Sequence, residues 1–374
     1  GGNTEGVIFS QESDINLDGI TVTPIGTPEK PFKGTYNSNA YSISNLKIYS
    51  ESDNIGFFGY TNGATINNPY FIGSNVTGKD NVGALIGYAE NTVVNAANIN
   101  AAMTGNQYVG GVVGYAKKST INGTFNSGSM LAVTYAGGLV GMLDESTLMN
   151  SENFITIEAM EPFAGGVSGF TNNSTIVNSY NMANISGASY VGGVTGKSVN
   201  SNIENVYSVG TVTGTSVVGG FIGEIDNEVK SCYYMDYENP VASGSSNGLT
   251  KMASAPIMMS LLNKWVTDKS SSKYYEWLED EGYAYPVLGT SMTNWVTDFE
   301  FVGSNLNLNY NTAVESNGIL YVASYDKDGR LVTCNSYTAS GSYSIPVTSS
   351  VTRAKAFIWD SNLSPLDVCM ERIR

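Results

Sequence analysis

The chain has 374 residues, a formal net charge of −15 and no histidine, and it carries 42 glycines but only 14 % charged residues. The lack of histidine excludes Ser-His-Asp triads, Cys-His nucleophiles and HExxH zinc sites. The acidic balance argues against nucleic acid or anionic membranes as partners, because both are bound through clusters of Lys and Arg. We therefore expect a turn-rich β protein without metal or cofactor, built as two domains or as a solenoid with an appendage.

Residues 1–45 are expected to form an N-terminal cap that leads into a repeat. The chain begins at Gly1-Gly2 without a methionine, which favours a protein from which a targeting segment has been removed. The sequence has no apolar run of about 18 residues, so we expect no membrane insertion in this segment. We expect a monomeric protein that is secreted and located at the bacterial cell surface or in the cell wall.

Residues 46–240 contain a repeat with a period of 27 or 28 residues. Its mark is a Gly-rich box, which occurs seven times as IGFFG, GALIG, GGVVG, GGLVG, GGVSG, GGVTG and GGFIG. A unit of this length cannot bury its own apolar face, whereas stacked units pair each strand with the units above and below it. The repeat therefore predicts a parallel β-solenoid, or parallel β-helix, of seven to eight coils, right-handed like other parallel crossovers.

Three columns of side chains follow the boxes. An aliphatic column contains Ile66, Val93, Ile121, Leu148, Ile176, Ile203 and Val229. A polar column contains Asn68, Asn95, Gly123, Asn150, Asn178, Asn205 and Ser231, and an interrupted aromatic column contains Tyr70, Phe125, Tyr180, Tyr207 and Tyr233. We expect the aliphatic side chains to form the dry interior and the Asn side chains to hydrogen-bond from coil to coil.

The glycine doublets of the boxes predict corners where the backbone has a positive φ, or where coil and interior lie too close for a Cβ atom. A phosphate-binding loop is the competing interpretation. It requires a preceding strand, a following helix and positive charge, and the sequence around the boxes offers none of these.

The unit V-G-G-x-x-G followed by S/T-I-x-N-S-Y, as in VGGVTG with NIENVYSVG, resembles the Glug motif. Repeats of that family occur in bacterial surface proteins, including adhesins and the non-catalytic region of some immunoglobulin A peptidases. Segments 23–48 and 231–239 resemble the parts that precede and follow such repeats. The sequence departs from the motif at IGFFG, which lacks the doublet, and at Gly123, which interrupts the Asn column. The resemblance implies an extracellular repeat architecture without one fixed activity.

Residues 241–290 are expected to cap the end of the solenoid, which would otherwise expose unpaired strand edges. Within them, MASAPIMMSLLNKWV (252–266) predicts a short helix with Ser254 as its N-cap and a proline in its first turn. The apolar face of this helix contains Ile257, Met258, Leu261, Leu262 and Trp265. We interpret it as a plug against the last coil, with a ligand groove as the alternative.

Residues 291–374 lack the repeat and alternate between apolar and polar positions, which predicts a small antiparallel β-sandwich. The turn of one hairpin is expected at residues 326–329, which read DKDG. This part resembles a short C-terminal module of secreted Gram-positive bacterial proteins. Cys232, Cys334 and Cys369 are interpreted as buried thiols, and pairing of Cys334 with Cys369 is left open.

Tyr60, Tyr88 and Tyr115 recur directly after three successive boxes, so stacking of the coils would bring them together. Such an aromatic strip could bind an extracellular glycan or a host or bacterial surface protein. The other interpretation is that these tyrosines only cover neighbouring coils.

Parallel β-helices also carry polysaccharide hydrolases and lyases. Glycoside hydrolysis uses two carboxylates that face each other, and the acidic candidates here are Asp144, Glu145, Glu224 and Asp226. A lyase needs cationic side chains to neutralise a uronic acid, yet no Arg precedes Arg330. We expect a non-catalytic adhesion or binding protein, with a polysaccharide-active enzyme and a passive spacer as the alternatives.

Overall fold

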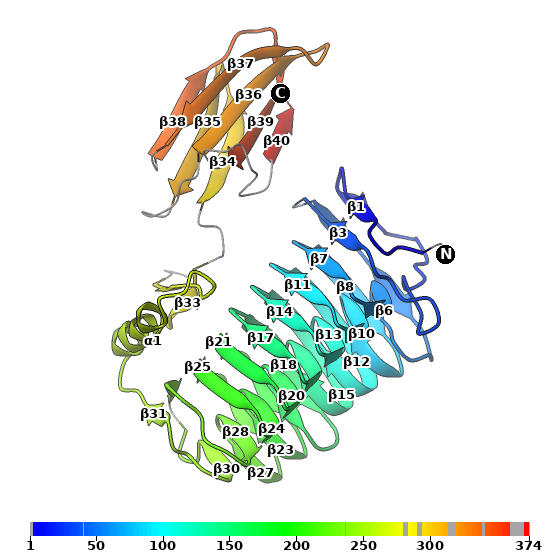
Figure 1. The fold of residues 1–374 in the computed structure, drawn as a ribbon, viewed down its shortest axis with the longest axis vertical. Helices are drawn as coiled ribbons and strands as arrows, with labels where there is room; N and C mark the ends of the chain where they lie inside the picture. Colours follow the sequence, from blue (N-terminus) through cyan, green and yellow to red (C-terminus); the bar gives the residue numbers. More distant parts are fainter. Residues whose placement is uncertain are drawn as a thin grey trace. The chain divides into compact units, whose positions relative to one another are not determined.

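The computed structural model describes residues 3–39, 41–235, 237–279, 283–289, 294–312, 319–338, 341–359 and 370–373. The chain consists of two compact units, Gly1–Gly289 and Thr290–Arg374. Figure 1 shows that the first unit is a stack of parallel coils and that the second contains antiparallel strands. The predicted fold class is confirmed.

The first unit is a parallel β-solenoid. One of its faces is an eight-stranded sheet, which we call the box sheet. Every strand of the box sheet except the last begins inside a Gly-rich box. Its strands are β6 (Phe58–Asn62), β10 (Ile86–Glu90), β13 (Val113–Lys117), β16 (Val140–Asp144), β20 (Ser168–Asn172), β24 (Thr195–Val199), β28 (Ile222–Ile225) and β30 (Val241–Ser243). They pair in this order, and every pairing is parallel.

The other 23 strands of the solenoid form two further faces. The short-strand face contains β1 (Ile8–Ser10), β3 (Thr35–Asn37), β7 (Thr65–Asn67), β11 (Val93–Asn95), β14 (Thr120–Asn122), β17 (Thr147–Met149), β21 (Thr175–Asn181), β25 (Asn202–Ser208), β29 (Cys232–Tyr234) and β31 (Leu249–Lys251). The long-strand face contains β2 (Ile15–Asn16), β4 (Ser42–Ser44), β5 (Lys47–Tyr49), β8 (Tyr70–Thr77), β9 (Asp80–Gly83), β12 (Asn98–Gly110), β15 (Phe125–Gly137), β18 (Glu152–Ala159), β19 (Ala164–Gly165), β22 (Ile185–Ser186), β23 (Ser189–Gly192), β26 (Val212–Thr213) and β27 (Ser216–Gly219).

Equivalent positions of successive coils pair with one another. The aliphatic column in the structure contains Ile66, Val94, Ile121, Leu148, Ile176 and Ile203. Our assignment is therefore wrong at one coil, because Val93 lies between Thr65 and Thr120 while Val94 is the buried residue. Two adjacent valines look alike to a hydrophobicity pattern, and the interval from Ile66 to Val94 is one residue longer than the next interval.

The glycine doublets are explained by crowding. None of the doublet glycines has a positive φ, so that part of the expectation is wrong. A Cβ atom on Gly111 would collide with the buried Asn126, and one on Gly138 would collide with the buried Asn153. The doublets therefore let the inner polar side chains approach the backbone of the box sheet.

Asn side chains connect neighbouring coils, as expected, but they form two ladders. One ladder follows the strand ends, where Asn67 donates to Asn37 at 2.8 Å and Asn95 donates to Asn67 at 3.0 Å. The other lies at the next corner and contains Asn150, Asn178 and Asn205, joined by bonds of 2.8 and 2.7 Å. Asn150 also donates at 2.7 Å to Asn122, a strand-end residue in register with Asn95. Asn95 thus lies one position before the corner column to which the sequence pattern assigned it.

Helix α1 (Ala255–Lys269) covers the outer flank of the last coils instead of plugging their end (Figure 1). Its buried residues are Met258, Leu262, Trp265 and Val266. They pack against the aromatic column of the short-strand face, which contains Tyr180, Tyr207 and Tyr233. Ile257 and Leu261 of the expected apolar face are exposed, and Ser254 occupies the N-cap position without a side-chain capping bond.

The segment after α1 runs back along the same flank and contains the small hairpin of β32 (Trp277–Leu278) and β33 (Val287–Leu288). We call residues 255–289 the strap. Asn150 donates to the Lys273 carbonyl at 2.7 Å, and the Trp277 indole nitrogen donates to Asn178 at 2.9 Å. The strap also explains the break in the Asn column, because a Cβ atom on Gly123 would lie 2.6 Å from the Tyr275 hydroxyl oxygen.

Part of the expected N-terminal cap is itself coiled. Strand β1 pairs in parallel with β3, and β2 pairs in parallel with β4. Phe9 and Ile15 lie over the core residues Tyr36 and Ile43, but they are 41 % and 40 % exposed. The first coil therefore has inward-pointing side chains of the core type at the open end of the stack.

The second unit is the predicted antiparallel β-sandwich. One sheet contains β34 (Asn294–Val302), β35 (Asn305–Thr312) and β38 (Gly341–Pro346), and the other contains β37 (Leu331–Tyr337), β36 (Ile319–Asp326), β39 (Val351–Trp359) and β40 (Met370–Ile373). A shared core contains Leu306 and Leu308 from the first sheet and Leu320 and Val322 from the second. The predicted hairpin turn at residues 326–329 is confirmed between β36 and β37.

The cysteine prediction holds for one residue and fails for another. Cys232 is a buried free thiol, whereas Cys334 is exposed, because it lies on an outward position of β37. Cys369 lies outside the described residues, and so does its proposed pairing with Cys334.

Candidate binding surfaces

Two outward columns run along the box sheet, at the third and the fifth residue of its strands. The third position holds Tyr60, Tyr88, Tyr115, Met142, Phe170, Lys197 and Glu224. The ring centroids of Tyr60 and Tyr88 lie 4.8 Å apart with an interplanar angle of 8°, and those of Tyr88 and Tyr115 lie 4.9 Å apart at 13°. The structure thus brings the three predicted tyrosines together as one stack.

The hydroxyl groups at the two ends of this stack are bound to carboxylates of the fifth column. The Tyr60 hydroxyl donates to Glu90 at 3.1 Å, and the Tyr115 hydroxyl donates to Asp144 at 3.2 Å. Desolvation, together with the bond to Glu90, raises the pKa of Tyr60 to about 12. Desolvation and the Asp144 charge likewise raise the pKa of Tyr115. All three tyrosines are half-buried, so ring edges and hydroxyl oxygens, not free ring faces, are what a ligand would meet.

A second aromatic column lies at the corner before the box sheet. It contains Tyr108, Tyr135, Phe163 and Tyr190, whose successive ring centroids are 4.7, 4.9 and 5.0 Å apart. Tyr108 contacts Tyr115 edge to face at 5.2 Å, and Phe163 contacts Phe170 at 5.5 Å. The two columns form one continuous surface, here called the aromatic strip, which contains Tyr60, Tyr88, Tyr108, Tyr115, Tyr135, Phe163, Phe170 and Tyr190.

The corner aromatics have an unusual backbone conformation. Their φ angles are +55°, +53°, +75° and +53° in chain order. The preceding two coils place Asn54 and Asn81 at this corner, with φ of +61° and +54°. Asn tolerates the left-handed region, whereas a bulky side chain there costs of order 1–2 kcal/mol. Four successive coils therefore carry an aromatic residue where Asn or Gly would be less strained, and the next coil carries Val217 there with a φ of +53°.

Our sequence reasoning overlooked this column, although the signal is visible. An aromatic residue stands two positions before each of four successive glycine doublets, in YVGG, YAGG, FAGG and YVGG. The columns predicted from the sequence all lie after the boxes, so they include Tyr60, Tyr88 and Tyr115 but not the aromatic residues that precede the boxes.

Asp144 and Glu224, the two acidic candidates on separate strands of the box sheet, do not form a facing pair. Asp144 and Glu224 lie on β16 and β28, three strand steps apart, which is about 14 Å at a strand spacing of about 4.8 Å. Inverting glycosidases place their carboxylates no more than about 9.5 Å apart. Each acidic candidate also has a partner. Asp144 accepts a hydrogen bond from Asn172 at 2.8 Å, and Asp226 accepts one from the Asn200 backbone at 3.0 Å. Glu145 forms an ion pair with Lys118 at 3.7 Å, and Glu224 forms one with Lys197 at 2.7 Å.

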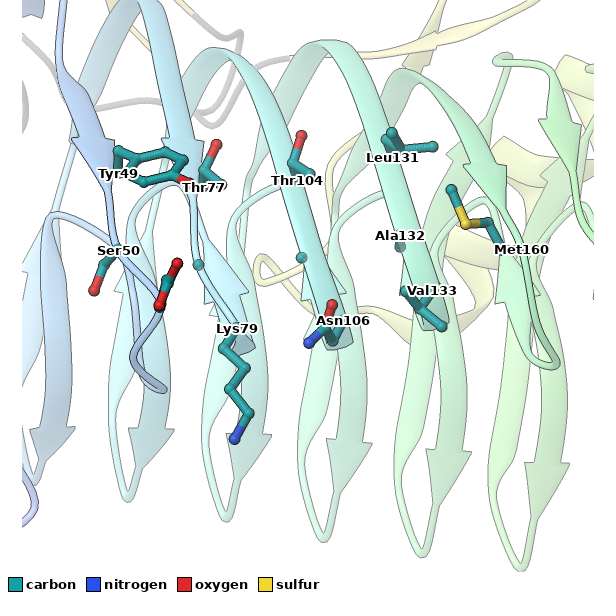
Figure 2. A pocket seen from close by; sticks show the side chains of 13 residues that line it. Tyr49, Ser50, Thr77, Lys79, Thr104, Asn106, Leu131, Ala132, Val133 and Met160 are labelled. Atoms are coloured by element: carbon teal, nitrogen blue, oxygen red, sulfur yellow. The ribbon is translucent and has the colours of Figure 1, made fainter.

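A groove of about 520 Å³ lies on the long-strand face. Figure 2 shows two rows of side chains along it, one of Tyr49, Thr77, Thr104 and Leu131, and one of Lys79, Asn106 and Val133. Between the rows, Gly78 lies so close to the core that a Cβ atom would be 2.7 Å from the Ile55 side chain, and one on Gly105 would be 2.8 Å from Val82. The missing side chains let the backbone sink toward the core, which hollows the outer face.

No protein-family model and no curated protein matches the chain. A solved structure named "IgA1 Protease" is similar with a TM-score of 0.47 and 14 % identity, and the match covers 99 % of this chain and 33 % of that protein. This chain thus spans about a third of that protein's length. Within the described residues, no helix is long and apolar enough to cross a membrane, and no cluster of His, Cys, Asp and Glu could hold a metal ion.

Proposed function

We propose that the chain is a non-catalytic, extracellular binding protein that contacts a partner protein through the aromatic strip. The observation that carries the proposal is the left-handed backbone of Tyr108, Tyr135, Phe163 and Tyr190. Strained residues of this kind cost stability and are characteristic of functional sites. An aromatic side chain retained at this cost in four successive coils is well explained by a contact that needs the ring.

A protein surface suits the strip better than a sugar. Because the rings stack on one another, the strip offers edges and hydroxyl groups on a rigid sheet, and Tyr is the residue type that such flat protein contacts favour. From β6 to β24 the strip spans five strand steps, or about 24 Å. The column beside it places Glu90, Lys117 and Asp144 on successive strands, so it offers a partner charged contacts of both signs at the rim.

A non-catalytic role is supported by the separation of Asp144 from Glu224 and by the bonds that already engage the acidic candidates. The resemblance of the repeat to the Glug motif supports a location at the bacterial surface. A passive spacer is the alternative, and it requires no ligand for the strip.

The test replaces aromatic residues of the corner column by Asn, the residue that the two preceding coils have at the same corner. The chain is measured by biolayer interferometry against a panel of extracellular-matrix proteins and mucins. Tyr135→Asn and Tyr190→Asn should each weaken binding about 30-fold, as a hot spot worth about 2 kcal/mol requires. Ile72→Ala, an exposed change on the long-strand face, is the control and should leave binding unchanged. If the wild-type chain binds no protein of the panel, the spacer is favoured; if it binds and the Asn variants bind equally well, the strip is not the contact surface.

A further inference from the structure

We infer that the groove on the long-strand face is a second binding site, which takes a neutral linear polysaccharide lying along the solenoid axis. The groove is lined by side chains that differ from those of the aromatic strip. Its volume of about 520 Å³ falls in the range of ligand sites in proteins. It lies on the long-strand face, where β12 and β15 also carry Tyr108 and Tyr135 of the aromatic strip at the adjoining corner.

The rows of the groove repeat at the spacing of the coils. Thr77 pairs with Tyr49 on one side and with Thr104 on the other, and Thr104 pairs with Leu131. One outward side chain is therefore available at each step of about 4.8 Å. A pyranose unit of an extended glycan is about as long as this step, so successive sugars would meet equivalent positions. From Tyr49 to Met160 the groove crosses four steps, or about 19 Å, which accommodates about four sugar units.

The chemistry of the lining fits sugars. The hydroxyl groups of Thr77 and Thr104 and the amide of Asn106 can bond to sugar hydroxyls from both sides of the floor. Tyr49 stands at one end of the groove and is 81 % exposed, in contrast to the half-buried rings of the strip. An exposed Tyr ring is the apolar platform on which the face of a sugar ring packs. Leu131 and Met160, 37 % and 57 % exposed, extend the apolar contact toward the other end.

The charge of the groove selects a neutral glycan. Lys79 lies 3.4 Å from Asp53 and 3.6 Å from Asp80, so two carboxylates compensate the ammonium group on this rim. The net charge of the chain is −15, which repels polyanions at long range. Uronic acid polymers and sulfated glycans should therefore bind more weakly than uncharged ones.

The experiment is calorimetric titration of the full chain with neutral linear oligosaccharides of glucose, xylose and mannose, from disaccharide to hexasaccharide. Affinity for at least one series should rise with length up to the tetrasaccharide and then level off. Tyr49→Ala and Thr104→Trp should each lower it at least tenfold, the first by removing the platform and the second by filling the groove. Ile72→Ala lies on β8 outside the groove and serves as the matched control.

Three results would overturn the inference. These are no binding of any neutral oligosaccharide, stronger binding of oligogalacturonate than of neutral sugars, and binding that neither Tyr49→Ala nor Thr104→Trp reduces. Circular dichroism of both variants verifies that the solenoid is intact, and Tyr49→Phe, which keeps the ring, should retain binding. Because these positions lie outside the aromatic strip, failure here would leave the protein-binding proposal untouched.

Discussion

Asn178→Ala should detach the strap from the solenoid, because this one side chain joins two coils to the strap. Its Nδ2 donates to Asn150 at 2.8 Å and to the Tyr275 carbonyl at 2.9 Å. Its Oδ1 accepts from Asn205 at 2.7 Å and from the Trp277 indole nitrogen at 2.9 Å. The residue is fully buried, so water cannot replace these partners without opening the flank.

The expected loss can be worked out from these contacts. Four hydrogen bonds at about 1 kcal/mol each contribute about 4 kcal/mol. Asn178 has a φ of +49°, and Ala in the left-handed region adds about 1 kcal/mol. The variant should therefore lose about 5 kcal/mol of unfolding free energy in the coils that carry the strap. Asn178→Gly accommodates the same φ without a Cβ, so it should be about 1 kcal/mol more stable than the Ala variant.

The assay is urea unfolding followed by Trp fluorescence, combined with hydrogen exchange of residues 255–289. Exchange in the strap should rise in Asn178→Ala while exchange in β6 and β10 stays at the wild-type level. Asn67→Ala is the matched control, since Asn67 belongs to the strand-end ladder, is only half-buried and makes two ladder bonds. Equal losses of stability in the two variants, or unchanged exchange in the strap, would refute the reasoning.

Three further predictions concern single side chains. Gly123→Asn should lower the thermal stability because the new side chain meets the Tyr275 hydroxyl, and adding Tyr275→Ala should recover part of the loss; no recovery would argue against a steric cause. The pKa of Tyr60 is raised to about 12 in the folded chain, so folding favours the neutral phenol. The resulting contribution to the free energy of unfolding is complete below the pKa of about 10 that Tyr has in the unfolded chain. It is lost as the pH rises from about 10 through 12. Comparison of wild-type and Tyr60→Phe alkaline unfolding checks it, and identical profiles would count against it. Burial raises the pKa of Cys232 to about 12, whereas Cys334 is exposed. Iodoacetamide should therefore label Cys334 in the native chain and Cys232 only after unfolding, which peptide mass spectrometry would detect. Equal labelling rates of the two cysteines would contradict the burial of Cys232.

The solenoid was predictable because its interior repeats in the sequence. Ile176 and Ile203 occupy equivalent positions, and only a stack of coils can bury every member of such a column. The precise register was harder, since Val93 and Val94 are interchangeable to a hydrophobicity pattern and only the pairing with Ile66 distinguishes them. Local composition thus determines the architecture, while a single-residue offset in one coil depends on packing.

The corner aromatics and the strap were beyond local rules. A positive φ favours Asn or Gly, so nothing in backbone preference points to Tyr135 or Phe163 at that corner. The amphipathic pattern correctly predicts helix α1, but its partner is the outward column of Tyr180 and Tyr207, which the sequence alone does not connect with it. The bond between Asn178 and Trp277 joins residues 99 positions apart, and no periodicity links them.

The strap also bears on how a protein of this kind can change its length. A coil can be duplicated or deleted as a whole without disturbing its neighbours, because each coil contacts only the next one. The strap is bound to Asn150 and Asn178 and needs the bare backbone at Gly123, so it fits a fixed number of coils. Gain and loss of coils by recombination is therefore confined to the part before Gly123, and the reach of the rod can evolve while its strapped end stays constant.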